Sequence, residues 1–593
     1  MIAAEDETDR KSDLDIMKDE YKDMVNTYGL PKDEVRPAYG MPGPNKKREE
    51  QHPLAPRLVF TPEQEALADT ERVVLEPIDD THADLLDRMY WYLRRHRGTI
   101  SLNTLWKLYY KLPRPRLRYM DDYMIRAFFS HLTWTEHAHM SPQLRRRYFM
   151  LLDQCVGEKI RLTPVEWSAA MHLAGRAARI GTDSEVKDAI ELWLEMEQSG
   201  VPANRVVFNV LFDVAVKAGR YALADTIINE LKSRGLELDR YFRMNMIYYA
   251  GVRGDGDAVR KAFNDMVNAG EIIDTAVMNC VILSFIRSGE PAAAEHVFLK
   301  MNALHASKLF SAKGPTDWRK RRRLASLLNK TGQRLREERE RHESSFFGAQ
   351  FSGDARREQI QEASPVAPDA LTYRLLIRYH TRGSGDLDRV QELLAEKKER
   401  GFHVHGSVYL TIFSAFIIHG GYAHSAWTPK VLESFWKEFL EATSAPNAID
   451  SPIPNKEATE TPPVDVAPES DALGPLPPSP DASESLPDSK KTTQTPPVAG
   501  EAEVKHLDPF DGPQGLLEIE DEEPGVSALS EEHRAPYFTF GLAVTVLRAF
   551  HKCMGTPRML EVWDEMKVRW KDCGTEDMTK IESKIEDIRK WDL

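Results

Sequence analysis

Hydrophobic and polar positions in the middle of the chain follow the period of an amphipathic helix, and glycines break this pattern at regular intervals. Such stripes run from about Val206 to Lys217 and from about Ala222 to Ser233, and Gly235 follows the second stripe. Signals for strands and hairpins are few. The pattern therefore predicts an all-α fold built from pairs of amphipathic helices.

The helix pairs recur with a fixed period, because Gly200, Gly235 and Gly270 stand 35 residues apart in similar surroundings. Apolar residues recur four positions before these glycines and one turn earlier, and a second glycine series separates the helices of each pair. The three series are Met196, Leu231, Met266 and Met301; Trp193, Ile228, Phe263 and Phe298; and Gly219, Gly254 and Gly289. We expect the apolar series in the core, because stacked pairs bury faces that one pair cannot bury alone.

One unit carries three motifs in order: Arg205-Val-Val-Phe-Asn209, Lys217-Ala-Gly-Arg220 and Leu231-Lys-Ser-Arg-Gly-Leu-Glu-Leu-Asp239. Together they resemble the consensus of the pentatricopeptide repeat (PPR) family, and the period differs from the 34 or so residues of tetratricopeptide repeats. The resemblance implies a right-handed α-solenoid of stacked helix-turn-helix repeats with an inner groove. Similar units are expected at Pro164 to Asn204, Arg240 to Asp274, from Thr275 onward, from Pro368 onward, Gly406 to Leu440 and Gly541 to Trp570.

The charge is distributed unevenly along the 593 residues, whose net charge is −14. Residues 441–534 hold 21 Asp or Glu, 5 Lys or Arg and 16 of the 36 prolines, a composition that cannot form a core. Residues 51–440 carry a net charge of +6. The part expected to fold is therefore basic, and the acidity belongs to a linker expected to be disordered.

These features divide the chain into seven expected segments. They are an extended or disordered arm (1–60), diverged helical pairs (80–162), pentatricopeptide repeats (163–302), a charged helical insert (303–365), further helical repeats (366–440), the acidic Pro-rich linker (441–534), and a C-terminal repeat with a cap helix (535–593).

The family resemblance implies that each repeat reads one base with its fifth and last residues. Ser168 with Asn204 would then favour adenine, and Asn209 with Asp239 would favour uracil. Three further positions fit less well: Asp274 is paired with the apolar Met244, the insert obscures the partner of Asn279, and Arg374 with His405 matches no familiar pair. An alternative stays open for all of them, because Asn and Asp beside a helix start are also ordinary N-caps.

Clusters of arginine offer a second kind of RNA contact, to phosphates and without base choice. They lie at Arg114 to Arg118, at Arg145 to Arg147 and in the insert. In the insert, Trp318 beside the arginines could stack on a base. The insert candidates are Trp318, Arg319, Arg321, Arg322 and Arg323. The alternative is that these runs are solvated helix faces.

No catalytic or cofactor motif emerges from the sequence. His137 with His139, and His403 with His405, lack further ligands at zinc spacing, and the P-loop and HExxH patterns are missing. The four cysteines lie too far apart in sequence to suggest a zinc cage or a disulfide framework. We therefore expect neither an enzyme, a metal nor a cofactor, and no membrane span, since no run of about 18 apolar residues occurs.

The resemblance implies a mitochondrial, fungal-like factor that binds single-stranded RNA and acts in transcript stability, processing or translation. The acidic start, Met1 to Asp15, shows no import presequence. A protein-binding scaffold is the alternative, such as an assembly factor for respiratory complex I or a protein associated with the mitochondrial ribosome. The acidic linker is either a tethered polyanion that competes with RNA for the basic groove or an inert spacer.

Overall fold

The computed structural model describes residues 13–26, 74–94, 102–133, 142–175, 183–307, 324, 326–335, 357, 360–362, 364, 366–444, 536–570 and 574–589. The chain divides into two compact units, Met1–Ala448 with Asp508–Leu593, and Ile449–Leu507. Every described residue belongs to the first unit. Most of the acidic linker and the insert candidates from Trp318 to Arg323 lie outside the described residues.

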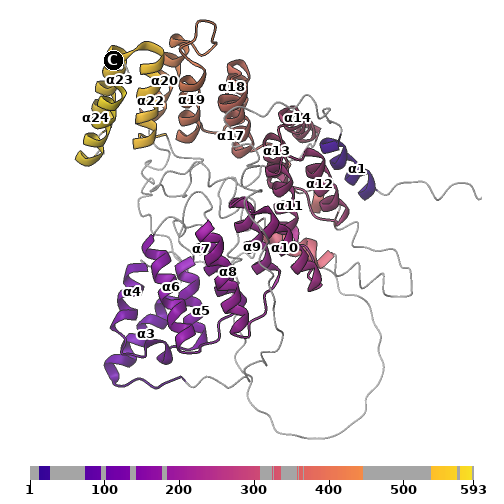
Figure 1. Cartoon of the computed structure of the whole chain (residues 1–593), viewed down its shortest axis with the longest axis vertical. Coiled ribbons are helices and arrows are strands. Elements are labelled where there is room, and N and C mark those ends of the chain that lie inside the picture. Colours follow the sequence, from indigo (N-terminus) through magenta and orange to yellow (C-terminus); the bar gives the residue numbers. More distant parts are fainter. Residues whose placement is uncertain are drawn as a thin grey trace, which may run out of the picture. The chain divides into compact units, whose positions relative to one another are not determined.

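Within the described residues all regular structure is helical, which confirms the all-α class (Figure 1). Seven helix pairs follow one another in chain order. They are α7 (Pro164–Ala174) with α8 (Asp183–Gln198), α9 (Arg205–Lys217) with α10 (Tyr221–Ser233), α11 (Arg240–Val252) with α12 (Gly256–Asn268), α13 (Thr275–Ser288) with α14 (Pro291–Ser307), α17 (Ala370–Tyr379) with α18 (Leu387–Glu399), α19 (Gly406–His419) with α20 (Pro429–Ser444), and α22 (Phe540–Met554) with α23 (Thr556–Arg569).

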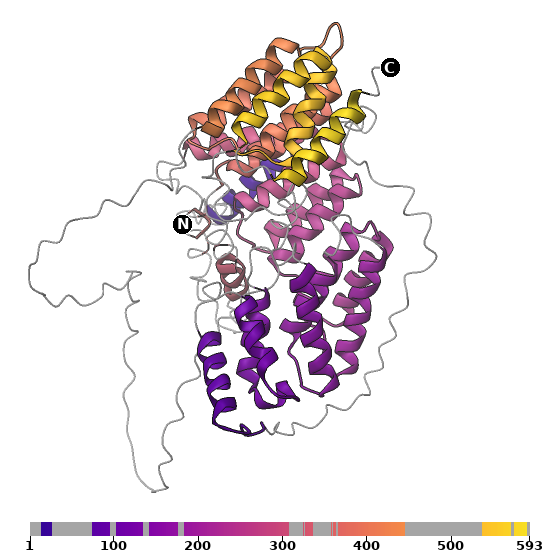
Figure 2. The same cartoon turned by 90° about the vertical axis from the view of Figure 1, so that its left-hand side faces the viewer.

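The pairs stack through their first helices. Helix α7 packs on α9, α9 on α11 and α11 on α13, and the series continues from α13 to α17 and from α17 to α19. Helix α19 in turn packs on α22, and Figure 2 shows the C-terminal pair beside α19 and α20. The insert after α14 and the linker after α20 therefore interrupt the sequence without interrupting the stack, as a solenoid requires.

The periodic apolar residues form the core, as expected. Trp193, Met196, Leu231, Phe263 and Met266 are each fully buried. The first helices add aromatic contacts between neighbouring pairs, such as Phe212 stacked on Phe242 with ring centroids 4.9 Å apart. Burial of these side chains on both helices is what holds each pair to the next.

Glycines end the second helices in a left-handed conformation. Gly235 follows α10 with φ +67°, its amide donates to the Lys232 carbonyl, and the next amide, of Leu236, donates to the Leu231 carbonyl. These two bonds satisfy carbonyls at the helix end that otherwise have no partner. The second glycine series also has positive φ, from Gly219 through Gly289, which explains why both series recur with the repeat.

Four helices and a 3₁₀ turn precede the repeats, in the segment expected to hold diverged pairs. They are α3 (Asp80–Arg94), α4 (Leu102–Lys111), η2 (Arg116–Tyr119), α5 (Asp122–Thr133) and α6 (Pro142–Gly157). Helix α3 packs on α4 and α5, and α5 and α6 both reach α7. At the other end, α24 (Thr575–Arg589) packs on α22.

The N-terminal arm is not extended throughout, contrary to expectation. It contains α1 (Asp13–Asn26), which packs on α12 and α14. Tyr21, Met24 and Val25 are buried there, and the Gln361 side chain donates to the Tyr21 hydroxyl at 3.0 Å. Among the described residues, α1 packs its apolar side chains mainly on helices that follow more than 200 residues later in the chain. The acidic sequence of the arm alone does not indicate so distant a partner.

Candidate nucleic-acid interface

The last residue of each unit caps the first helix of the next. Asn204, Asp239, Asp274 and Asp369 precede α9, α11, α13 and α17 in extended conformations, and their side chains accept hydrogen bonds from backbone amides in the first turn. One example is the bond from the Phe242 amide to Asp239, at 2.9 Å. Such caps stabilise a helix by about 0.5–2 kcal/mol, so these residues have a structural role whatever else they do.

The fifth residues lie in the second turn of the same helices. Ser168, Asn209, Met244 and Asn279 are buried, whereas Arg374 is partly exposed. Asn209 is 3% exposed, and its Oδ1 accepts a hydrogen bond of 2.8 Å from Asn245 Nδ2 on the next first helix. Asn245 Oδ1 is buried without a partner among the described residues. Ser168 is fully buried and donates to the Val165 carbonyl at 2.9 Å. Met244 is buried in the core.

The structure supplies the partner of Asn279 that the insert obscured. Asn279 Nδ2 donates to Asp369 Oδ1 at 3.0 Å, and Thr372 Oγ1 donates to Asn279 Oδ1 at 2.7 Å. Asp369 also caps α17, so it corresponds to Asp239 and Asp274 in the other units. The sequence contained the signal: Pro368-Asp-Ala-Leu-Thr-Tyr begins a unit, and the residue before that unit is the last of the preceding one.

Asp274 is held by a buried arginine. Arg240, the first residue of α11, is 1% exposed, and its Nη2 lies 2.6 Å from Asp274 Oδ1. The same guanidinium donates to the Ile272 carbonyl. Asp274 thus joins two successive units while capping α13. The polar fifth and last residues described above therefore lie at the starts of the first helices, and their side chains are already hydrogen-bonded within the protein.

The insert returns to this end of the helices. Residues 326–335 form a helix in which Gln333 Oε1 accepts from Arg205 Nη2 at 2.8 Å. A Cβ on Gly332 would lie 3.0 Å from Glu271 Oε2, so glycine permits a close approach to the loop before α13. Further on, the Gln361 side chain bonds both the amide and the carbonyl of Ile273, each at 2.7 Å.

Arginines on or directly after the second helices bridge neighbouring units through carboxylates. Arg234, the residue directly after α10, pairs with Glu197 on α8, and Arg389 on α18 pairs with Glu295 on α14 at 2.9 Å. Burial alone would raise the pKa of Glu295, but hydrogen bonds from His380 and Arg389 outweigh it and hold the pKa below its usual range. These arginines are neutralised within the solenoid.

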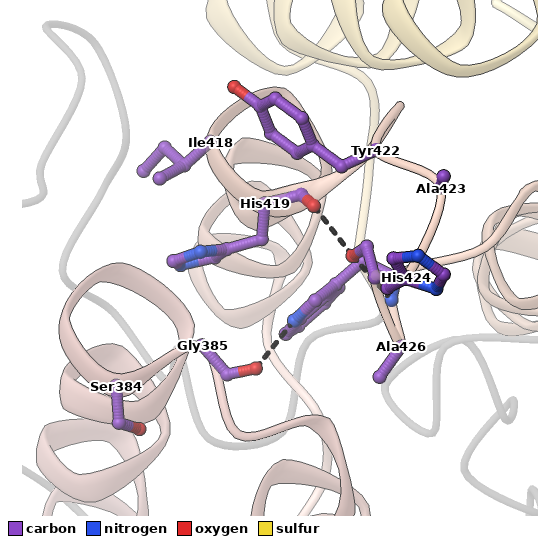
Figure 3. A pocket seen from close by; sticks show the side chains of 10 residues that line it. Ser384, Gly385, Ile418, His419, Tyr422, Ala423, His424 and Ala426 are labelled. Atoms are coloured by element: carbon purple, nitrogen blue, oxygen red, sulfur yellow. Dashed lines mark hydrogen bonds between the residues drawn. The ribbon is translucent and has the colours of Figure 1, made fainter.

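A pocket of about 450 Å³ lies between the π-helical turn after α17, η3 (His380–Ser384), and the α19–α20 loop (Figure 3). Trp427 Nε1 donates to the Gly385 carbonyl at 2.7 Å, and the His419 ring stacks on Trp427. Tyr422 lines the pocket and is 63% exposed. The polar groups of this corner join two loops to each other.

Among the described residues, no group of three or more His, Cys, Asp or Glu side chains could hold a metal ion. The described cysteines, Cys155, Cys280 and Cys553, are free thiols. No helix of this part of the chain is long and apolar enough to cross a membrane.

The comparison with family models agrees with the repeat pattern. The PPR family model, described as PPR repeat, matches residues 206–236, which comprise α9 and α10. A search of curated proteins finds no match. Solved structures of PPR10 are among those found similar. The complex of PPR10 with an 18-nt psaJ RNA element is 14% identical in sequence, covers 88% of this chain and has a TM-score of 0.28. The structure of PPR10 from maize is 15% identical in sequence, covers 84% of this chain and has a TM-score of 0.31.

This chain spans 62% of the PPR10 chain in the RNA complex and 57% of the maize PPR10 chain. The likeness to pentatricopeptide repeats rests on three other observations: the 35-residue period, the stacked helix pairs with their glycine series, and the repeat matched at residues 206–236. Residues 206–236 therefore match a pentatricopeptide repeat, and helix pairs of the same kind recur around them with a 35-residue period.

Proposed function

We propose that this protein is a non-catalytic, single-stranded RNA-binding factor of mitochondria that acts in the stability, processing or translation of an organellar transcript. Pentatricopeptide repeats can read one base per unit with two or three side chains. The observation that carries the proposal is the recurrence of Asn and Asp at the fifth and last positions, as Asn209 with Asp239 and Asn279 with Asp369. The mitochondrial location is proposed from the family alone.

One buried acceptor beside Asn209 could bond a base. Asn209 and Asn245 already bond each other, and Asn245 Oδ1 has no partner among the described residues although it is buried. An unpaired buried acceptor is unfavourable by about 1–3 kcal/mol. A base that presents an N–H, such as the N3–H of uracil, would satisfy it, while Asp239 keeps its cap on α11.

A protein-binding scaffold is the second candidate, and the internal bonding of the solenoid favours it. Four of the fifth-position side chains, Ser168, Asn209, Met244 and Asn279, are buried, and Arg234 and Arg389 are paired with carboxylates. A solenoid whose repeats bond their polar groups internally suits protein partners, such as those of respiratory complex I assembly or the mitochondrial ribosome. The two candidates differ in what co-purifies from organelles.

Crosslinking and sequencing of RNA bound in isolated mitochondria tests the proposal. The informative variant is Asp239→Asn, because Asn caps a helix as well as Asp does but changes the group offered to a base. The matched control is Asp255→Asn, which alters the same kind of cap on α12, a second helix. Enrichment of one transcript that Asp239→Asn weakens and Asp255→Asn does not would support base reading.

Three other results bear on the proposal. An absence of enriched RNA, with respiratory-complex intermediates or ribosomal proteins co-purifying, would favour the scaffold. Equal losses with Asp239→Asn and Asp255→Asn would show that the caps act through stability only. Cell fractionation checks the location, and recovery of the full-length protein outside mitochondria would contradict that part of the proposal.

A further inference from the structure

The helices before the repeats have a charge pattern that differs from the rest of the chain. Residues 80–162 hold 15 Lys or Arg against 8 Asp or Glu, an excess of seven positive charges in a chain of net charge −14. In the repeats, arginines such as Arg234 and Arg389 pair with carboxylates. The contacts that the structure shows for Arg116 and Arg147 are instead with aromatic rings and one tyrosine carbonyl.

Four side chains from three elements form what we call the Tyr110 cluster: Trp106 and Tyr110 on α4, Arg116 on η2 and Arg147 on α6. The Arg116 guanidinium carbon lies 4.9 Å from the Tyr110 ring centroid, and the Arg147 guanidinium carbon lies 5.5 Å from the Trp106 ring. The Trp106 and Tyr110 rings meet edge to face at 5.5 Å. Trp106 is 8% exposed and anchors the cluster, whereas Tyr110 is 45% exposed.

Further exposed cations lie on the same two helices. Lys107 and Lys111 on α4 and Arg146 on α6 are exposed, and Lys107 lies one helical turn before Tyr110. A related arrangement occurs on α3 and α5, where the exposed rings of Tyr90 and Tyr123 lie 5.8 Å apart and the Arg94 guanidinium carbon is 5.5 Å from the Tyr90 ring. Open aromatic rings among cations therefore recur on the N-terminal helices.

This combination is suited to a single strand of nucleic acid. Cations track the phosphates, and an open ring stacks on a base without regard to its identity. A duplex keeps its bases stacked inside, so it would meet the cations but not the ring. We propose that the Tyr110 cluster binds single-stranded RNA outside the repeats, with Tyr110 stacked on a base and Arg116, Arg147 and Lys107 facing phosphates. The inference takes RNA from the proposed function but concerns a different surface and needs no base reading.

The test is a fluorescence-anisotropy titration of the full-length protein with labelled oligouridine and oligoadenosine of about 20 nucleotides, at several salt concentrations. Tyr110→Ala removes the open ring. The matched control is Tyr422→Ala, which removes a tyrosine that is 63% exposed and has Lys552 Nζ 5.1 Å from its ring centroid, but lies in the α19–α20 loop. Thermal unfolding checks that both variants remain folded.

We expect Tyr110→Ala to weaken binding of both oligonucleotides by roughly 5- to 150-fold, the range for removing one stacked base. Tyr110→Phe and Tyr422→Ala should bind like the wild type. Arg116→Gln combined with Arg147→Gln should lower the slope of log affinity against log salt by about 1.4, because each phosphate that is no longer neutralised accounts for about 0.7. A duplex RNA should bind Tyr110→Ala as it binds the wild type.

Unchanged affinity of Tyr110→Ala for single strands, or an equal loss with Tyr422→Ala, would overturn the inference while leaving the proposed function intact. A loss for the duplex as large as that for the single strand would also overturn it, because stacking on a base would not explain it. Failure of the wild type to bind any RNA would overturn both the inference and the proposed function.

Discussion

Removing the buried cation of Arg240 tests whether adjacent units are joined as the structure shows. The substitution Arg240→Met keeps most of the side-chain volume but leaves Asp274 buried without its charged partner. Asp274 is 4% exposed and would keep only its cap on α13. Breaking a buried ion pair by removing one partner destabilises a protein by about 3–5 kcal/mol, and we expect that range here.

The double variant Arg240→Met with Asp274→Asn removes both charges of the ion pair and so measures the coupling between the two side chains. Asn keeps the cap on α13 but carries no charge, so no uncompensated ion remains. Replacement of both partners of a buried pair is often close to neutral. The double variant should therefore recover most of the stability that Arg240→Met loses, and the coupling energy follows from the cycle that the single Asp274→Asn completes.

Hydrogen exchange of the amides in α11 and α13 is the suitable assay, because a repeat array does not unfold in one step and a single global midpoint would average over units. The opening free energy of these two helices should fall in Arg240→Met and return in the double variant, while α22 and α23 remain unchanged. A loss below about 1 kcal/mol in the single variant, or a double variant as unstable as the single one, would refute the reasoning.

Three further predictions follow from individual contacts and from the linker. Hydrogen bonds hold the folded pKa of Glu295 below its ordinary value of 4.5, so the contribution of that carboxylate to stability is complete above about pH 4.5 and is lost as the pH falls through the folded pKa. Glu295→Gln should therefore reduce the acid sensitivity of amide hydrogen exchange in α14 and α18. An unchanged pH profile would exclude this role. Gly235→Ala should lower the opening free energy of α10 by about 1–2 kcal/mol, because φ is +67° there. Gly157 lies in open space and has no positive φ, so Gly157→Ala should change the stability of its own helix, α6, little. Equal effects of the two substitutions would contradict the account of the turn. Deletion of residues 445–530 should raise RNA affinity and change its salt dependence if the acidic linker competes with RNA, and unchanged binding in an anisotropy titration would identify an inert spacer.

The periodic part of the structure could be predicted from the sequence, because its causes are local. The apolar series from Trp193 to Met301 became the core, and Gly235 ends α10 through its own left-handed conformation. Each repeat shows the same pattern of apolar residues and glycines, so the 35-residue period predicts both the helices and the turns between them. The N-cap alternative for Asn204 and Asp239 also appears in the structure, while their reading of bases stays a prediction.

Contacts between distant segments could not be predicted. Helix α1 packs on α12 and α14, and no local signal in an acidic arm indicates so remote a partner. The Tyr110 cluster combines Trp106 and Tyr110, four residues apart on α4, with Arg147, which lies on a helix about 40 residues later in the chain. The contact of Asn279 with Asp369 spans the whole insert, although the unit that begins at Ala370 identifies Asp369 once the insert is set aside.

The most direct test of the central claim is a binding titration of the purified full-length protein with a single-stranded RNA pool, the same sequences as duplex, and single-stranded DNA, at about 150 mM salt. The account predicts that the single-stranded RNA binds most tightly and that its affinity falls with salt. Equal affinity for the duplex, or no measurable binding of single-stranded RNA, would contradict it.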